Sequence, residues 1–523
     1  MTDIIVAESD GWSGIVAALR RAQPGDRVLI GPGRYAGDET LVVQSGVTLS
    51  GCADANLEFT GGIDDLSGIT QGAWVTQLPY RDQGSLQFTM RMASAKTPGK
   101  VALQVRHAED VTVEGLRLTA WRGLKDLDSG HFDGSMILLE STTRCLVQNC
   151  ALYSMAWRGP AIVFRSSSDA KVLNNDIFGG YWGIALLSSR GLIEGNSSHH
   201  CHEAGIYLQP DPDDLNRPSD AVIRSNHCYD NGRGGVVLKS SFSEAIAGNV
   251  CRHNELSGIS LERYHKSPDV PSQAIIRGNY CHDNLNAGIV LMSSVCEVIE
   301  DNECWNNNLP GILLTRFDLS PEAPSQAVIR SNRCHDNADA GVALVSSSSE
   351  TIESNECWSN ATSGIVLSRA KMSPHAPSSA VIRRNRCFDN QAAGVHLLSA
   401  DSEAIESNDC WDNGLSGIVL ARCELTPGKP SRSVIRVNRC HHNADSGILL
   451  GASNSDSIEG NECWSNERNG ISIEGVNASP VLPSVAALRM NFVASSGASA
   501  IQFVASTGSA EGNLFKIIVR TMY

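Results

Sequence analysis

The chain has 523 residues, a formal net charge of −15 and 42 Lys and Arg residues against 57 Asp and Glu. This acidic balance argues against nucleic acid as a partner, because binding to phosphates depends on clustered positive charge. No stretch approaches the roughly 18 consecutive apolar residues of a membrane-spanning helix, so no membrane partner is expected.

The N-terminal residues 1–52 predict a cap and the first coils of the fold. Residues 15–21 (Ile-Val-Ala-Ala-Leu-Arg-Arg) predict a short amphipathic helix, and residues 27–30 and 47–51 predict strands. We expect the helix to cover an open sheet end, because exposed sheet edges are a liability. The first five residues lack the basic and apolar segments of a signal peptide, which favours a cytoplasmic location.

Residues 53–221 form an irregular region. Short runs of alternating apolar residues continue through it, and period-two alternation predicts strands. The bends between these runs vary in length and carry charged and aromatic residues. We therefore expect irregular coils with loop insertions.

Five copies of a 53-residue unit occupy residues 222–486. Each opens on a hydrophobic-hydrophobic-Arg triplet, such as Val222-Ile223-Arg224, and contains two similar rungs of 23 and 30 residues. A fixed period predicts a solenoid, in which each repeat buries its apolar face against its neighbours. A sixth opening at Ala487-Leu488-Arg489 decays, so residues 487–523 are predicted to form a C-terminal cap.

Three columns of like residues recur through these rungs. Stacked Asn amides are expected to hydrogen-bond along the column. Bends that contain Asn and Gly are expected between the strands, because both residues tolerate the left-handed conformation. Alternating Arg and Glu predict a ladder of cross-strand ion pairs. Cys residues are expected to point inward as reduced thiols, because in-register side chains point the same way and not at each other. The columns are Asn226, Asn249, Asn279, Asn302, Asn332, Asn355, Asn385, Asn408, Asn438 and Asn461; Arg277, Glu300, Arg330, Glu353, Arg383, Glu406, Arg436, Glu459 and Arg489; and Cys228, Cys251, Cys281, Cys304, Cys334, Cys357, Cys387, Cys410, Cys440 and Cys463.

The pattern Gly-Ile-x-Leu, Ser, Ile-x-x-Asn-x-Cys-x-x-Asn resembles the right-handed parallel β-helix repeat of carbohydrate-binding proteins and sugar hydrolases. The opening segment, through residues 24–30, 32–35 and 47–51, is similar to that of the pectin-lyase-like superfamily. This resemblance implies an all-β fold, a single-stranded right-handed parallel β-helix with an N-terminal capping helix. A leucine-rich repeat is the rival fold, but it lacks this opening segment and places Leu where this chain has Gly-Ile or Gly-Val.

The bends that precede the Gly-Ile-x-Leu strand break the pattern of the repeats between residues 119 and 204. Aligned to the repeat, they fall at 119–134, 155–160, 179–182 and 200–204, and we expect them to lie side by side along one edge. Regular repeats carry mostly Ala, Asn, Ser and Gly there, and local departures from a consistent pattern are where function is expected. The candidate substrate-binding residues at this edge and its adjoining strand are Trp157, Tyr181, Trp182, Arg122, Gln209 and Lys239.

The resemblance also implies a chemistry for this edge. Lyases and C5-epimerases of the superfamily neutralise a uronate carboxylate with Ca²⁺ or a cationic side chain, and a base removes the C5 proton. A glycoside hydrolase would instead need two carboxylates, and Asp211, Asp213 and Asp214 are available. No cofactor is required, with Ca²⁺ as the optional ion. The candidate residues are Lys125, His131, Tyr207 and Arg158 for catalysis, and Asp126, Asp128, Asp133, His200 and His202 for a metal.

The outward position after each Cys forms an aromatic and His stripe from Tyr229 to Trp464. Its Trp residues recur every two rungs, about 10 Å apart, which is near the length of a disaccharide. The simpler interpretation is a duplicated packing solution that covers one sheet. The sequence thus predicts a protein that binds or acts on carbohydrate or a glycosylated small molecule near residues 121–240, closer to a uronate lyase or C5-epimerase than to a glycoside hydrolase if it is an enzyme. The alternative is a non-catalytic scaffold that binds protein partners.

Overall fold

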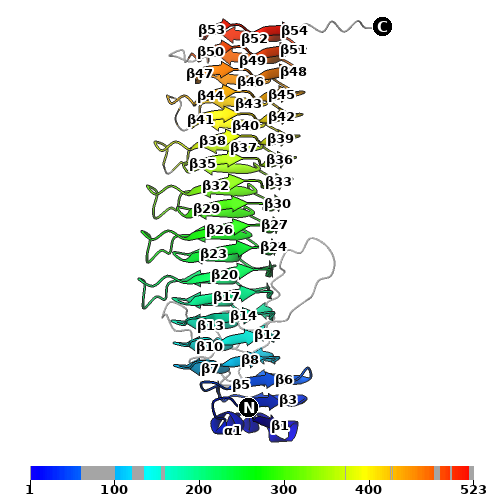
Figure 1. Ribbon diagram of the computed structural model, residues 1–523, viewed down its shortest axis with the longest axis vertical. Helices are drawn as coiled ribbons and strands as arrows, with labels where there is room; N and C mark the ends of the chain where they lie inside the picture. The colour runs from blue at the N-terminus through cyan, green and yellow to red at the C-terminus, as the bar shows by residue number, and fades with distance from the viewer. Residues whose placement is uncertain are drawn as a thin grey trace, which may run out of the picture. The chain divides into compact units, whose positions relative to one another are not determined.

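The computed structural model describes residues 2–60, 101–120, 135–154, 159–371, 373–423, 426, 428–475, 483–494 and 497–516. The chain divides into two compact units, Met1–Ala221 and Val222–Tyr523. Each unit is a right-handed coil of three strands per turn, and corresponding strands of successive turns pair in parallel (Figure 1). In each unit we call the three resulting sheets A, B and C, in the order in which the chain enters them. The predicted parallel β-helix is therefore confirmed.

The first unit contains one short 3-10 helix, η1 (Glu8–Asp10), one α-helix, α1 (Gly11–Arg21), and three sheets. Sheet A consists of β1 (Asp3–Val6), β2 (Arg27–Ile30), β5 (Thr48–Gly51), β8 (Thr112–Glu114), β11 (Leu146–Gln148), β14 (Ala170–Leu173) and β17 (Arg190–Glu194). Sheet B consists of β3 (Gly33–Gly37), β6 (Ala55–Phe59), β9 (Arg117–Ala120), β12 (Ala151–Ser154), β15 (Asp176–Gly179) and β18 (Ser197–His199). Sheet C consists of β4 (Leu41–Val42), β7 (Leu103–Arg106), β10 (Ile137–Glu140), β13 (Ile162–Arg165), β16 (Trp182–Leu187) and β19 (Ala204–Gln209).

The second unit repeats the same order with greater regularity. Its sheet A consists of β20 (Asp220–Arg224, which begins two residues before the boundary), β23 (Phe242–Ala247), β26 (Gln273–Arg277), β29 (Val295–Glu300), β32 (Gln326–Arg330), β35 (Ser348–Glu353), β38 (Ser379–Arg383), β41 (Asp401–Glu406), β44 (Arg432–Arg436), β47 (Asn454–Glu459), β50 (Val485–Arg489) and β53 (Thr507–Glu511). Its sheet B consists of β21 (His227–Tyr229), β24 (Val250–Arg252), β27 (Tyr280–His282), β30 (Glu303–Trp305), β33 (Arg333–His335), β36 (Glu356–Trp358), β39 (Arg386–Phe388), β42 (Asp409–Trp411), β45 (Arg439–His441), β48 (Glu462–Trp464), β51 (Phe492–Ala494) and β54 (Leu514–Lys516). Its sheet C consists of β22 (Gly234–Lys239), β25 (Ile259–Glu262), β28 (Ile289–Met292), β31 (Ile312–Thr315), β34 (Val342–Val345), β37 (Ile365–Ser368), β40 (Val395–Leu398), β43 (Ile418–Ala421), β46 (Ile448–Gly451), β49 (Asn469–Glu474) and β52 (Ser499–Val504).

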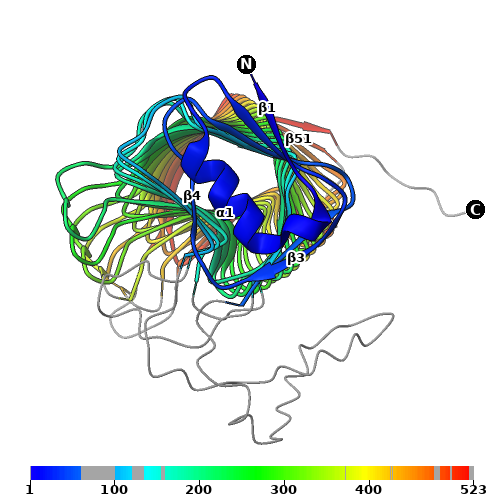
Figure 2. The same cartoon turned by 90° about the horizontal axis from the view of Figure 1, so that it is seen from below.

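Helix α1 lies across the N-terminal end of the first coil (Figure 2). It buries Trp12, Ile15 and Leu19, and the Trp12 ring packs on Phe59 of β6 at 5.9 Å between centroids. This placement covers the apolar interior and confirms the predicted N-terminal cap, although the helix begins at Gly11 and not at residue 15. Across the described ranges, no helix has the length and apolar character needed to cross a membrane.

The predicted Asn column forms a continuous line of buried amides. Asn355, for example, accepts hydrogen bonds from Asn332 N and Nδ2 at 2.9 and 3.0 Å and donates Nδ2 to Ile329 O and Asn385 Oδ1 at 3.1 and 3.0 Å. The left-handed bends, however, are made by the residue before each Asn, such as Ser331 (φ 55°). Asn itself takes the left-handed conformation at other bends, such as Asn306 (φ 52°).

The Cys column is confirmed as an inward stack of free thiols. It packs against the Gly that begins each Gly-Ile-x-Leu strand. A Cβ on Gly341 would lie 2.7 Å from Gly364 O and 2.9 Å from Cys357 Cβ, so this position requires Gly and the facing position requires a small side chain. Burial raises the pKa of Cys440, which keeps its thiol protonated.

The Arg and Glu column on sheet A forms separate ion pairs. Three of the Glu residues bind the Arg of the following rung, with distances of 2.7 Å for Glu300–Arg330, 2.5 Å for Glu353–Arg383 and 2.6 Å for Glu406–Arg436. The Arg side chains are 37–53% exposed, so water screens each pair and its contribution to stability is small.

Candidate functional site

The outer face of sheet C in the first unit holds the described part of the predicted edge. Strand alternation points Ile184 and Leu186 of β16 into the core, and Ala185 and Leu187 outward. In-register pairing then places two outward rows side by side. One row is Leu138, Val163, Ala185 and Tyr207, and the other is Arg106, Glu140, Arg165, Leu187 and Gln209.

The bends that lead into these strands are stacked, as predicted. Tyr181 N donates to Gly159 O at 3.0 Å, and Glu203 N donates to Tyr181 O at 2.8 Å. The Gly pair 179 and 180 allows the turn into β16, because both residues have positive φ. The described portions of the bends at 155–160, 179–182 and 200–204 therefore lie beside one another.

Three aromatic side chains gather where these bends meet the outward rows. Trp182 stacks on Tyr207 with 4.2 Å between ring centroids and 8° between planes, and Tyr181 meets Trp182 edge to face at 5.0 Å. The Tyr207 hydroxyl donates to Gln209 Oε1 at 2.9 Å. Tyr207 and Gln209 are 3% and 4% exposed, so the hydroxyl reaches its acceptor inside a nearly dry contact.

A charged network lies on the same face, around Arg165. Its guanidinium binds Asp211 with two nitrogens, Asp213 at 2.5 Å and Glu140 at 3.2 Å, and Arg106 approaches Glu140 at 2.7 Å. Asp211 is 2% exposed, and its hydrogen bond raises the pKa of Arg165 well above the ordinary value. Arg165 is thus a permanent cation held by three carboxylates.

In the second unit, Lys239 belongs to a separate polar cluster on the outer face of sheet C. Its Nζ lies 3.7 Å from Glu262 Oε2, and that oxygen also accepts a hydrogen bond from Arg233 at 2.8 Å. Ser260 Oγ donates to the other carboxylate oxygen at 2.8 Å. Glu262 is 3% exposed, so its charge is balanced by these partners and not by water.

The two predicted metal-binding histidines have different partners. His200 stacks on Phe178 of sheet B at 5.1 Å, and its Nδ1 lies 2.9 Å from His199 Nδ1. His202 packs against Tyr181 at 5.6 Å. The described residues include no group of three or more His, Cys, Asp and Glu side chains placed to hold a metal ion.

The other predicted site residues lie outside the described residues and stay predictions. They are Arg122, Lys125, Asp126, Asp128, His131, Asp133, Trp157 and Arg158.

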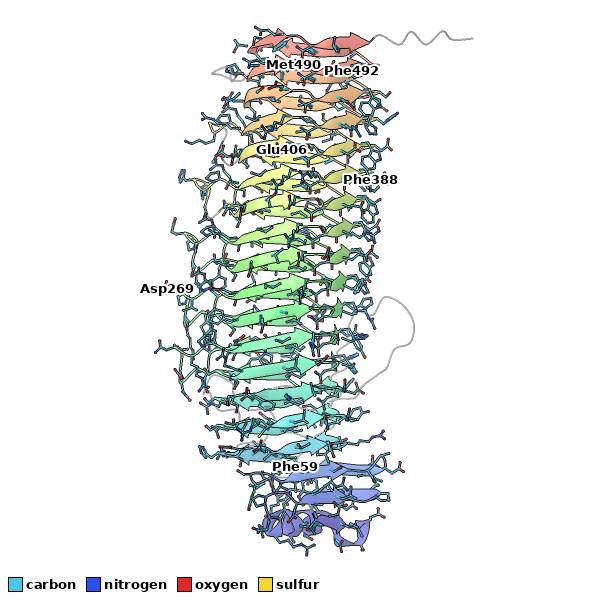
Figure 3. All side chains as sticks on the ribbon, viewed as in Figure 1. Phe59, Asp269, Phe388, Glu406, Met490 and Phe492 are labelled. Carbon is cyan, nitrogen blue, oxygen red and sulfur yellow. The ribbon has the colours of Figure 1, made fainter. Side chains whose placement is uncertain are left out.

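The aromatic stripe on sheet B of the second unit stacks on itself. Eight rings from His282 to Trp464 succeed one another at 4.1–5.9 Å, with 4–14° between neighbouring planes. Figure 3 shows Phe388 of this stripe on the outside of the coil, on the opposite side from Asp269. Because the ring faces meet one another, the stripe presents edges to solvent. This geometry supports the packing interpretation over sugar stacking on ring faces.

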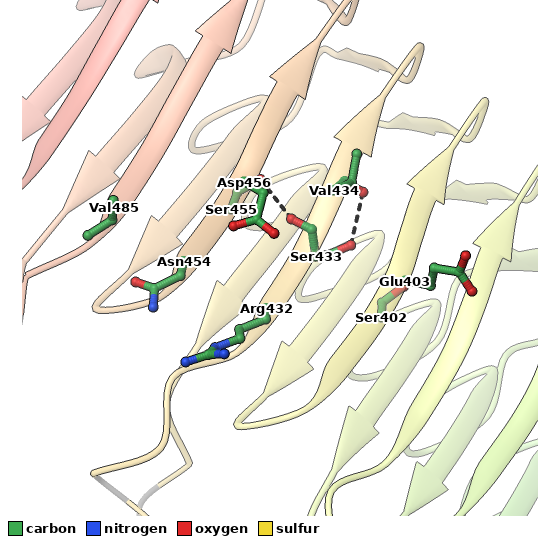
Figure 4. Close-up of a pocket in the computed structure, with 9 residues that line it drawn as sticks. All are labelled: Ser402, Glu403, Arg432, Ser433, Val434, Asn454, Ser455, Asp456 and Val485. Atoms are coloured by element: carbon green, nitrogen blue, oxygen red, sulfur yellow. Dashed lines mark hydrogen bonds between the residues drawn. The ribbon is translucent and has the colours of Figure 1, made fainter.

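One shallow groove lies on the outer face of sheet A in the second unit (Figure 4). It has a volume of about 450 Å³ and includes Glu403, Arg432 and Asp456 among its lining residues. It forms where the register shifts between Arg432 and Ile435, and the Ser455 hydroxyl donates to Ser433 O at 2.7 Å there. None of the predicted site residues that the structure describes lines it.

Two clusters were only partly visible in the sequence. Asp211 occupies the repeat position that Tyr264, Phe317, Ala370 and Cys423 occupy at 53-residue intervals, and its backbone N–H makes the same bond to a Ser hydroxyl. Asp211 is an acidic residue at a position that is apolar or small in the repeats, and this difference was the sequence signal for the Arg165 network. The Glu262 cluster carries a similar signal, because the corresponding positions of the next three repeats are Thr315, Ser368 and Ala421.

Comparison with known proteins shows one family match. The family described as right handed beta helix region matches residues 102–261, 240–375, 318–420 and 375–516. No curated protein matches the chain significantly. Similar solved structures include the Dettilon tailspike protein gp208 (14% identity, TM-score 0.44, 75% of this chain and 68% of that chain). Others are a double mutant of the periplasmic alginate epimerase AlgG (13%, 0.41, 79% and 84%) and the A-module of the Azotobacter vinelandii mannuronan C-5 epimerase AlgE6 (12%, 0.28, 96% and 94%).

Proposed function

Because the chain belongs to the right-handed β-helix family, and this fold is a scaffold on which sites are built, we propose that it binds or acts on carbohydrate. The proposed site is the outer face of sheet C in the first unit. The observation that carries this proposal is the partly exposed Tyr181, held edge to face against Trp182, on the same face as the Arg165–Asp211 network.

The chemistry of a sugar ring matches this combination. A pyranose presents apolar C–H faces and a rim of hydroxyl groups, which need aromatic surface and hydrogen-bonding groups close together. Tyr181 is partly exposed at the bend, and Gln209, Glu140 and Arg165 supply donors and acceptors on the adjoining strands. A partly exposed aromatic side chain and polar groups therefore lie within neighbouring turns.

The finer proposal is a uronate lyase or C5-epimerase-like activity. A substrate carboxylate would need its own cation, because Arg165 is already bound by Glu140, Asp211 and Asp213. Arg122, Arg158, or Ca²⁺ on Asp126, Asp128 and Asp133 would fill that role, and Lys125, His131 or Tyr207 would remove the C5 proton. Tyr207 would need to exchange its bond to Gln209 for one to the substrate.

A glycan array with neutral and uronate-containing oligosaccharides tests the proposal. Bound glycans would then be tested for turnover, with lyase activity followed by the ultraviolet absorbance of the unsaturated product and epimerase activity by deuterium uptake at C5. We expect Lys125→Ala or His131→Ala to abolish turnover without lowering the melting temperature. Lys171→Ala on the exposed face of β14 is the matched control and should behave as wild type.

Binding to no glycan on the array would contradict the carbohydrate proposal. If a protein also co-purifies, the alternative of a non-catalytic scaffold is supported instead. We keep the cytoplasm as the proposed location, because sixteen free thiols suit a reducing compartment, and fractionation of cells would test it.

A further inference from the structure

The five repeats of the second unit act as an internal alignment, and the first repeat departs from it at one place. Arg233 corresponds to Asn286, Asp339, Ala392 and Asp445 in the later repeats, and Lys239 corresponds to Met292, Val345, Leu398 and Gly451. Strand pairing confirms this correspondence, because Lys239 pairs with Glu262 as Met292 pairs with Thr315. Two cations thus appear at positions that the later repeats fill with neutral or acidic residues.

The two cations and the Glu262 carboxylate differ in how deeply they are buried. The Glu262 side chain is 4% exposed, whereas those of Lys239 and Arg233 are 14% and 29% exposed. The carboxylate is therefore the most deeply buried group of the three, and the guanidinium and ammonium groups lie closer to solvent. Ser260 fixes the second carboxylate oxygen from the same strand.

The fifth repeat supplies a natural comparison. Ser472 donates to Glu474 at 2.7 Å, so the Ser and Glu pair is present there, but Asp445 and Gly451 stand where the first repeat has Arg233 and Lys239. The pair of cations, and not the Glu itself, distinguishes the first repeat. A purely structural need for Glu at this position would not explain the added cations.

The electrostatic field of the cluster reaches the loop that follows β25. Burial and the positive charges of Lys239 and Lys266 lower the pKa of His265. The neighbouring loop therefore experiences positive potential, in a chain whose formal net charge is −15.

From this geometry we infer that Arg233 and Lys239 form a binding site for an anionic group, with Glu262 as a positioning residue that holds both cations in place. A carboxylate, sulfate or phosphate group would accept from the planar guanidinium and from the ammonium together. The inference does not depend on the glycan site of the first unit. An anionic sugar and a free inorganic anion share this chemistry, so the experiment must separate them.

Isothermal titration at low ionic strength would use four probes: glucuronate, glucose, inorganic sulfate and inorganic phosphate. We expect at least one anionic probe to bind and glucose not to bind. Binding of glucuronate alone identifies a sugar acid as the ligand class, whereas binding of sulfate or phosphate identifies the tetrahedral anion as sufficient. No binding of any anion, or equal binding of glucose, would overturn the inference.

Variants that borrow residues from other repeats test the site, and the melting temperature of each is measured beside its affinity. Lys239→Met and Arg233→Asn introduce the side chains of the second repeat and should each weaken anion binding at least tenfold. Glu262→Gln should strengthen binding severalfold, because a repelling charge is removed while hydrogen-bonding groups remain. Unchanged or weaker binding in Glu262→Gln would contradict the assignment, because the repelling charge would be gone while the hydrogen-bonding side chain stays.

Two further variants complete the set. Arg386→Gln, which removes an exposed Arg of sheet B, should leave affinity unchanged. Asp445→Arg with Gly451→Lys should add an anion site to the Ser472–Glu474 pair in a Lys239→Met background. A side chain fits at Gly451, because its nearest neighbour would be Leu420 O at 3.8 Å. Unchanged affinity in Lys239→Met, measured on protein with the wild-type melting temperature, would refute the site.

Discussion

Removal of Arg165 should be far more costly to the first unit than its position on an outer face suggests. Arg165→Leu introduces the residue that β16 carries in the same outward row, Leu187, so the shape is tolerated. It leaves Asp211, which is 2% exposed, with the Asp213 N–H at 3.0 Å as a remaining partner. A buried carboxylate that loses its cation costs about 3–5 kcal/mol. Asp211→Ala, which copies Ala370 of the third repeat, should cost only about 1–3 kcal/mol, because Arg165 keeps Glu140 and Asp213.

The two changes should therefore not add. In the double variant no buried charge is left alone, so its cost should approach that of Asp211→Ala. The coupling energy should then be close to the full cost of Arg165→Leu, about 3–5 kcal/mol. Urea unfolding followed by far-UV circular dichroism measures each free energy. Arg190→Leu, which breaks the exposed Arg190–Asp220 pair, should cost less than about 1 kcal/mol and serves as the control. Costs that add to within about 0.5 kcal/mol would refute the coupled network.

Two further predictions concern the second unit. Asn355→Ala removes four side-chain hydrogen bonds of about 1 kcal/mol each, so it should lower the free energy of unfolding by roughly 4 kcal/mol. Hydrogen exchange should accelerate in the rungs on either side. A decrease of less than about 1 kcal/mol in the free energy of unfolding would contradict the Asn ladder. Burial lowers the pKa of His396 from 6.5 to about 4, so between these values the unfolded chain binds more protons and stability falls as the pH drops, by up to about 3 kcal/mol. His396→Val, which copies its neighbours Val366 and Val419 in β37 and β43, should flatten that part of the stability curve, and urea titrations at several pH values would show an unchanged slope if His396 is not responsible.

The repeating parts of the fold were predictable because one rule acts many times. Alternation sets which side chains point inward, and a fixed period brings each Asn, Cys and aromatic residue onto its counterpart in the next rung. The inward Cys column and the Asn ladder follow from this rule alone. What the period could not specify was which residue of a bend adopts positive φ, since Ser331 and Asn332 are both competent and only the inward amide decides between them.

The site was less predictable because its contacts join residues from different turns through side-chain reach. Arg165 and Asp211 are 46 residues apart, and their contact depends on how the loop after β19 folds back over the outward row. The parallel stacking of Trp182 on Tyr207 likewise depends on a side-chain angle at a strand end. The predicted strand register correctly placed Tyr181, Trp182, Tyr207 and Gln209 near one another. It also placed His200 in that group, whereas the His200 ring stacks on Phe178 of sheet B.

Repetition itself separates the groups that serve the fold from those that serve a ligand. The ring stripe from His282 to Trp464 is the most conspicuous surface feature of the sequence, yet its faces are taken up by stacking, as a repeated solution to covering a sheet requires. A ligand that binds at a single site on a repeat protein requires side chains that occur in only one of the repeats. Arg233 and Lys239 meet that condition, because four other repeats fold without either cation at the same backbone position. A substitution toward the other repeats should therefore cost binding while preserving the coil, and substitution of a repeated residue such as Asn355 should do the reverse.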